Sequence, residues 1–135
     1  MAGVYNFVVR QGSDKTLSLI YEDKNGLVDL TSKTAAMQLR KEVNSSDVLD
    51  FLSTENGRIT FEETTKNGET KLSKINLIFP NSVSSQYKFK ECVYDLEIYT
   101  DMGGGETHVK RLIEGKIFIS FEVTRIEFWL RGTIW

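Results

Sequence analysis

The stretch Cys92-Val93-Tyr94-Asp95-Leu96-Glu97-Ile98 decides the fold class of this chain. Two sets of residues alternate along it: Cys92, Tyr94, Leu96 and Ile98 against Val93, Asp95 and Glu97. Successive side chains of a β-strand point to opposite faces, so this pattern predicts a strand with one buried face. Strands buried on one face are typical of antiparallel sheets.

The same period of two recurs through the chain. It is clear in residues 16–21, 35–40 and 116–123, and apolar runs predict further strands at 5–9, 48–52, 58–61, 73–79, 109–113 and 126–130. Short strands at regular spacing with turn residues between them are typical of sandwiches and barrels. We therefore predict an all-β fold, an antiparallel β-sandwich or barrel of about 8–10 short strands.

Turn residues separate these runs. Asn25-Gly26, Asn56-Gly57 and Asn67-Gly68 each supply residues that tolerate positive φ, which favours tight hairpins. Three glycines at 103–105 predict a hairpin tip. Residues 81–91 follow the chain's one proline and lack an apolar stripe, so we expect at most one helical turn there.

The segment 126–135 carries both tryptophans and is partly apolar on both faces. Two interpretations stay open: it is the last strand of the domain's own sheet, or it docks on a neighbouring subunit. We assign residues 1–125 to one β-sandwich domain and 126–135 to an aromatic C-terminal strand or docking segment. The candidate partner-contact residues are Phe128, Trp129, Leu130, Ile134 and Trp135.

The composition excludes several kinds of chemistry. The 135 residues carry 17 basic and 19 acidic side chains, and this balance argues against nucleic-acid binding. One histidine and one cysteine cannot build a Cys/His metal cluster or a disulfide framework. We expect His108 to be an exposed strand-end residue and the carboxylate pairs Asp47/Asp50 and Asp95/Glu97 to be solvated. The sequence therefore predicts no enzyme, no catalytic residue, no metal and no cofactor.

The first residues contain no basic, secretory-type leader, and no apolar run is long enough to cross a membrane. Ala2 stands where N-myristoylation needs glycine. We expect a protein made in a cytoplasm, with no membrane partner and with Cys92 as a small buried hydrophobe.

Several short motifs follow one another in a distinctive order. They are Arg10-Gln11-Gly12-Ser13-Asp14, Asp29-Leu30-Thr31, Met37-Gln38-Leu39-Arg40, Leu52-Ser53-Thr54-Glu55-Asn56-Gly57-Arg58-Ile59, Tyr94-Asp95-Leu96-Glu97-Ile98, Arg111-Leu112-Ile113-Glu114-Gly115 and Glu122-Val123-Thr124-Arg125. Over residues 5–125 this order resembles small β-sandwich proteins of the tails and baseplates of tailed bacteriophages. It is also similar to the N-terminal domain of phage baseplate upper proteins. The family pattern ends near 125, and the segment 80–91 lacks the compact acidic turn of the family.

The resemblance implies an Ig-like sandwich with a structural role in the virion. We expect a non-enzymatic adaptor or connector of the tail, neck or baseplate, made in the host cytoplasm. Its partners would be other virion proteins and copies of itself, held through sheet edges and apolar contacts. Gly12 would turn the chain, Gly115 suits a bulge or a close backbone approach, and Tyr94 would face inward. With Pro80 as the one proline, the edges have little proline to block strand addition.

An alternative function is a carbohydrate- or receptor-binding module of a phage fibre. That function needs exposed aromatic side chains grouped on one face or at loop tips. The candidates are Tyr87, Phe89, Tyr99 and Trp129.

Overall fold

The structure is a computed structural model that describes residues 2–123. The described residues form eleven strands and one short helix, so the fold is almost entirely β, as predicted. The five candidate partner-contact residues, Phe128, Trp129, Leu130, Ile134 and Trp135, lie outside the described residues.

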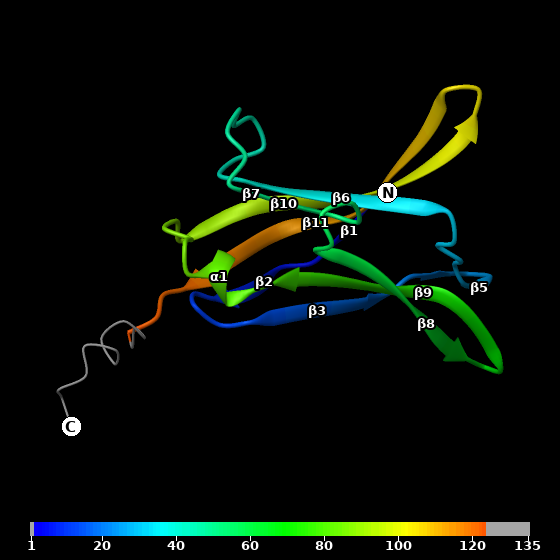
Figure 1. Cartoon of the computed structure of the whole chain (residues 1–135), viewed down its shortest axis with the longest axis horizontal. Helices are drawn as coiled ribbons and strands as arrows, with labels where there is room; N and C mark the ends of the chain where they lie inside the picture. Colours follow the sequence, from blue (N-terminus) through cyan, green and yellow to red (C-terminus); the bar gives the residue numbers. More distant parts are fainter. Residues whose placement is uncertain (1, 124–135) are drawn as a thin grey trace.

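The larger sheet has six strands in the order β1-β11-β10-β6-β7, with β2 also paired to β11. Its strands are β1 (Gly3–Val4), β2 (Phe7–Arg10), β6 (Lys33–Arg40), β7 (Asp50–Ser53), β10 (Glu91–Gly103) and β11 (Glu106–Ser120). In Figure 1 the β10–β11 hairpin projects beyond the body of the molecule at the upper right.

A second sheet has three strands in the order β3-β9-β8, and a third is a small hairpin. The strands are β3 (Lys15–Ile20), β9 (Glu69–Phe79) and β8 (Ile59–Lys66), with β4 (Glu22–Asp23) and β5 (Gly26–Leu27) in the hairpin. In Figure 1 the six-stranded sheet lies above the three-stranded sheet, and the helical turn α1 (Asn81–Ser84) lies at one end.

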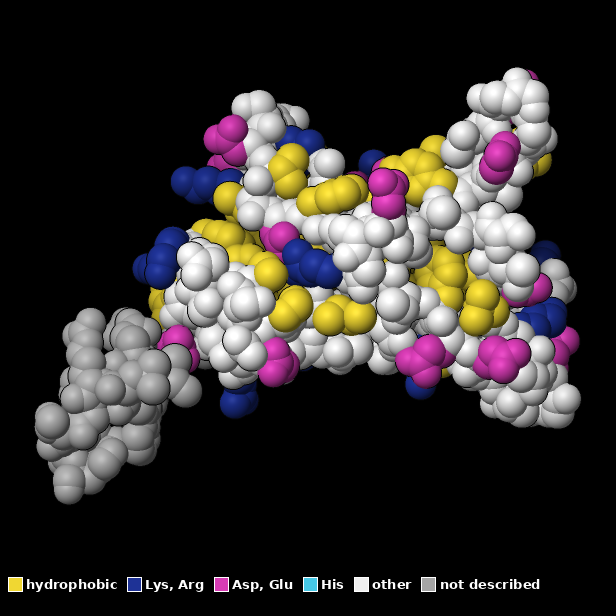
Figure 2. Space-filling view, in the orientation of Figure 1, with side chains coloured by type: hydrophobic (Ala, Val, Ile, Leu, Met, Phe, Trp, Pro, Cys, Tyr) yellow, Lys and Arg dark blue, Asp and Glu magenta, His cyan; other side chains and the backbone are white. Residues whose placement is uncertain are grey.

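The hydrophobic core lies between these two sheets. Met37, Leu96 and Ile117 from the larger sheet and Ile75 and Leu77 from the smaller sheet are almost completely buried in one cluster. Figure 2 shows a band of hydrophobic side chains across the middle of one face, where the two layers meet. Burial of apolar area from both sheets is the main term that holds the layers together.

The alternation in β10 is confirmed, because all four residues of its apolar set are buried. Tyr94 faces the core and Asp95 the other side, as predicted. Asn25-Gly26 joins β4 to β5, and Asn67-Gly68 joins β8 to β9 with φ angles of 53° and 80°. The glycines at 103–105 join β10 to β11, and α1 is one turn long, both as predicted.

The prediction of a purely antiparallel fold of short strands is wrong in two respects. β1 and β2 run parallel to β11, with Gly3 beside Ile113 and Phe7 beside Ile117. Alternation identifies the buried face of a strand but not the direction of its neighbour. The predicted strands 109–113 and 116–123 form one 15-residue strand, β11, which ends at Ser120.

The prediction that Asn56-Gly57 closes a hairpin is also wrong. The strand before it, β7, pairs with β6, and the strand after it, β8, pairs with β9. The turn therefore carries the chain from one sheet to the other. Its residues still have turn chemistry, because Gly57 has a φ of 81° and the Asn56 side chain bonds to nearby backbone.

Gly115 lies where the N-terminal segment crosses β11. A Cβ atom there would stand 2.2 Å from the carbonyl oxygen of Tyr5, so only glycine fits. Tyr94, which faces Gly115 across the β10–β11 ladder, donates its hydroxyl to the same Tyr5 oxygen at 2.6 Å. The predicted close backbone approach at Gly115 is confirmed, and it fixes the path of residues 3–10.

Candidate functional site

Sheet edges are the first candidate binding surfaces, because the outer backbone groups of an edge strand can pair with another chain. The larger sheet ends at β7 on one side and at β1 and β2 on the other. The three-stranded sheet ends at β3 and β8. Whether an edge is available depends on what already bonds to its outward N–H and C=O groups.

The edge of β7 is closed by side chains. Thr54 N–H donates to Ala35 of β6, and in this antiparallel register the backbone groups of Phe51 and Ser53 point outward. Phe51 N–H donates to the Asp50 carboxylate at 2.8 Å, and the Phe51 carbonyl accepts from the Asn56 amide at 3.0 Å. Ser53 N–H donates to Asn56 Oδ1 at 3.0 Å. Strand addition at β7 would have to break these bonds.

Asp50 also belongs to a polar cluster that links the two sheets. Arg58 donates to both of its carboxylate oxygens, at 2.7 and 2.9 Å, and the Tyr87 hydroxyl donates to Oδ2. Arg58 Nε donates to the Ile78 carbonyl at 3.1 Å, and its guanidinium lies 6.0 Å from the centre of the Phe79 ring. The side chains of Arg58 and Asp50 are only 16% and 13% exposed.

The environment fixes the protonation of this cluster. Burial acts to raise the pKa of Asp50, but the hydrogen bonds from Arg58 and Tyr87 and the charge of Arg58 outweigh it and lower that pKa below its ordinary value. Burial, together with the hydrogen bond to Asp50, raises the pKa of Tyr87 well above its ordinary value. Asp50 is therefore ionised, with its charge balanced by Arg58, and the Tyr87 hydroxyl keeps its proton. The expectation that Asp50 is a solvated surface carboxylate is wrong.

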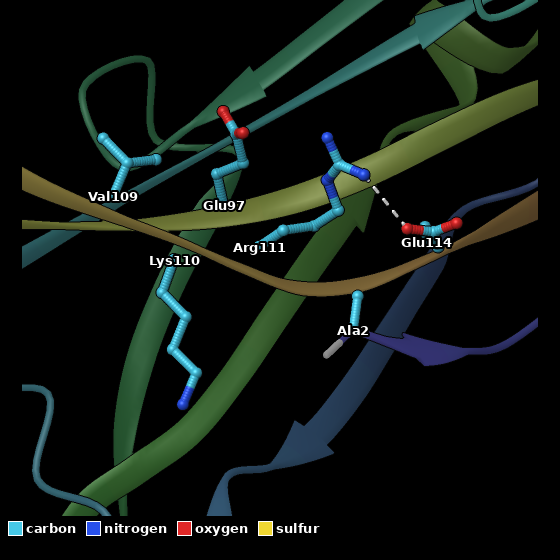
Figure 3. A pocket seen from close by; sticks show the side chains of 6 residues that line it. All are labelled: Ala2, Glu97, Val109, Lys110, Arg111 and Glu114. Atoms are coloured by element: carbon cyan, nitrogen blue, oxygen red, sulfur yellow. Dashed lines mark hydrogen bonds and ion pairs between the residues drawn. The ribbon is translucent and has the colours of Figure 1, made fainter.

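The outer face of the larger sheet carries a shallow hollow of about 440 Å³ (Figure 3). Arg111 lies between Glu97 and Glu114, donates to Glu114 at 3.2 Å, and lies 3.4 Å from Asp95 Oδ2. Burial and the neighbouring charge of Glu97 raise the pKa of Asp95. Opposite charges are thus mixed across this face, and such exposed pairs contribute little binding or stability.

The aromatic side chains that a glycan-binding site would need do not form one exposed group. Tyr87 is only 3% exposed, and Phe89 packs against it with ring centres 4.9 Å apart and the rings tilted by 40°. Tyr99 lies on the outer face and donates to Glu97 at 2.7 Å, a bond that, with partial burial, raises the pKa of Tyr99 to about 12. Trp129 lies outside the described residues.

Four exposed apolar side chains lie at or beside the end of β11. We call Val8, Phe118, Phe121 and Val123 the exit patch. Val8 and Phe118 are register partners on β2 and β11, with 47% and 39% of their surfaces exposed. Phe121 and Val123 follow at 45% and 91%. The sequence held a signal for this patch, because Phe118 falls among the polar residues of its strand.

The single cysteine and the single histidine behave as predicted. Cys92 is buried, and burial raises the pKa of its thiol to about 12. His108 is an exposed residue of β11. Within residues 2–123, no three His, Cys, Asp or Glu side chains lie close enough together to hold a metal ion.

Among the described residues, no helix has the length and apolar character needed to cross a membrane. No protein-family model matches the chain, and no curated protein matches it either.

Proposed function

We propose that this chain is a non-enzymatic structural protein of a tailed-phage virion, an adaptor or connector in the tail, neck or baseplate. It would assemble with other virion proteins and with copies of itself through sheet edges and apolar contacts. The support is the order of motifs over residues 5–125 together with the character of the exposed surface.

The exit patch is the observation that carries the proposal. Exposed apolar side chains beside one another, such as the register partners Val8 and Phe118, are typical of protein–protein contact. The patch includes the end of β11, and the candidate contact residues follow it in the sequence: Phe128, Trp129, Leu130, Ile134 and Trp135. The charged and polar groups of the Asp50–Arg58–Tyr87 cluster, by contrast, bond to one another within the fold.

The Ig-like sandwich is the finer part of this proposal. Two features support it: buried residues of both larger sheets share one core, and the Asn56-Gly57 turn leads from one sheet to the other. Two packed sheets of this kind leave an edge at each end of both sheets, and two outer faces, for contacts with partners.

The test is incorporation into particles of the phage that encodes the chain. Phe118→Asp places a charge in the exit patch and should strongly reduce the amount of this protein in purified virions, measured by quantitative mass spectrometry. Val109→Asp is the matched control, because Val109 is 47% exposed on the same strand but lies outside the patch. Equal incorporation of the two variants would contradict the role of the patch.

Deletion of residues 126–135 is a second test. The expected result is a folded domain that no longer enters particles. Unfolding of the domain would instead assign the segment to its own core. Binding on a glycan array that is lost in Tyr99→Ala would support the receptor-binding alternative.

A further inference from the structure

β3 is an edge strand with open backbone groups. Tyr21 N–H donates to the Ser73 carbonyl at 2.8 Å. This bond fixes which residues of β3 direct their backbone groups toward β9 and which direct them away. In this register the N–H and C=O groups of Thr16, Ser18 and Ile20 point away from β9. Within residues 2–123, no hydrogen bond reaches these outward groups. Among the described residues, nothing occupies this side of β3.

The other edges are less suited to strand addition. β7 is capped by Asp50 and Asn56, as described above. β2 has only four residues, and its Arg10 carbonyl already accepts from Ser13. β8 carries two successive exposed carboxylates, Glu62 and Glu63. A second β8 would bring like charges together, which disfavours pairing between copies.

β3 has no charged residue from Thr16 to Ile20, so a second copy of it introduces no repulsion there. Leu17 and Leu19 point toward the core but are only half-buried, because the sheet ends at this strand. A strand added beside β3 would cover them. The edge therefore offers matched hydrogen-bonding groups and apolar area to a strand like itself.

We propose that two copies of this chain pair through β3, antiparallel about a twofold axis at Ser18, to form one continuous six-stranded sheet. The inference rests on the proposed assembly function and names its partner and surface. Only residues with outward backbone groups can form the hydrogen-bonded pairs, so Ser18 faces the partner's Ser18 and Thr16 faces the partner's Ile20. Leu17 then packs against the partner's Leu19 on the core side.

Disulfide trapping of the full chain tests this register. Ser18→Cys should give a disulfide-linked dimer on mild oxidation, because facing residues in such a pair have Cα atoms about 5.5 Å apart. Thr16→Cys is the control: it lies on the same face, but the two copies would be about 14 Å apart along the strands, too far for a bond. The native Cys92 is buried and does not compete. Equal trapping of both variants, or none with Ser18→Cys, would overturn the proposal.

A second variant tests the hydrogen bonds. Ser18→Pro removes an N–H that the β3–β9 ladder does not use, and proline is tolerated where the N–H faces outward. The expected result is a native circular dichroism spectrum and a dimer dissociation constant raised about tenfold or more, measured by sedimentation. A folded Ser18→Pro protein that dimerises as before would contradict the inference.

These experiments use purified protein, whereas the proposed function is tested in particles. Incorporation that depends on the exit patch, without β3 trapping, would sustain the proposed function and refute this pairing. Trapping at Ser18 without incorporation into particles would support this pairing and refute the proposed function.

Discussion

Replacing Arg58 with methionine removes the cation that bridges the two sheets. The change deletes the bidentate ion pair with Asp50 and the bond to the Ile78 carbonyl, while the long side chain can still cover the Phe79 ring. Breaking a buried ion pair by removing one partner costs roughly 3–5 kcal/mol. Asp50 keeps its bonds from Tyr87 and Phe51 N–H, so we expect a loss near the lower end, about 3 kcal/mol.

The pH dependence of this loss follows from the lowered pKa of Asp50. In the native chain, ionised Asp50 stabilises the fold above the unfolded-state pKa, and that contribution falls away as the pH drops through the lower folded-state pKa. Without Arg58, burial raises the pKa of Asp50 with no cation to oppose it. Protonation of Asp50 then removes the unpaired buried charge. The difference in unfolding free energy between the native chain and Arg58→Met should therefore be largest near pH 7 and shrink below about pH 4.

Urea unfolding followed by circular dichroism at pH 7 and pH 3.5 measures both effects. Lys66→Met is the matched control, because the Lys66–Glu22 pair has a similar distance, 2.8 Å, but is 51% and 40% exposed. Its loss should be under about 0.5 kcal/mol. A loss below about 1 kcal/mol for Arg58→Met, or the same loss at both pH values, would refute the reasoning.

Three further substitutions test the packing and the closed edge. Gly115→Ala should destabilise the domain by about 2 kcal/mol through the clash with the Tyr5 carbonyl, while Gly3→Ala, whose new Cβ would lie 3.7 Å from the nearest side chain, should be nearly neutral in thermal unfolding. Asn56→Ala should lose about 1–2 kcal/mol and expose the β7 edge, seen as faster aggregation by light scattering. Leu96→Ala should cost about 3 kcal/mol in urea unfolding, because Leu96 is fully buried, and a loss under 1 kcal/mol would mean that the core closes around the gap.

The sequence predicted the strands better than their pairing. Alternation located the buried face of β10, and Asn67-Gly68 predicted a hairpin, because both signals are local. The strand predicted at 5–9 is present as β2, but the parallel pairing of β1 and β2 with β11 was missed, since no local pattern states which distant strand a segment will join. The prediction of a turn at Asn56-Gly57 was right, but the two strands that it joins belong to different sheets, which no local pattern states.

The candidate surfaces were only partly predictable. The scarcity of proline suggested open edges, but β7 is closed by Asp50 and Asn56. Their side chains accept hydrogen bonds from the outward N–H groups of the strand, so these groups cannot pair with another strand, as proline prevents at other edges. Tyr87 was a candidate exposed aromatic, yet its ring is buried and its hydroxyl donates to Asp50. The bonds that close β7 join residues near one another in the sequence, whereas Tyr87 and Asp50 lie 37 residues apart.

The N-terminal strands impose an order on folding. Gly3 pairs with Ile113 and Phe7 with Ile117, so the first strands have their ladder partner in a strand made about a hundred residues later. Contacts of such high contact order slow the search for the native topology, since a long loop must close before they form. During synthesis, β1 and β2 must wait until β11 has left the ribosome. We therefore expect the larger sheet to be completed at its N-terminal edge late in folding.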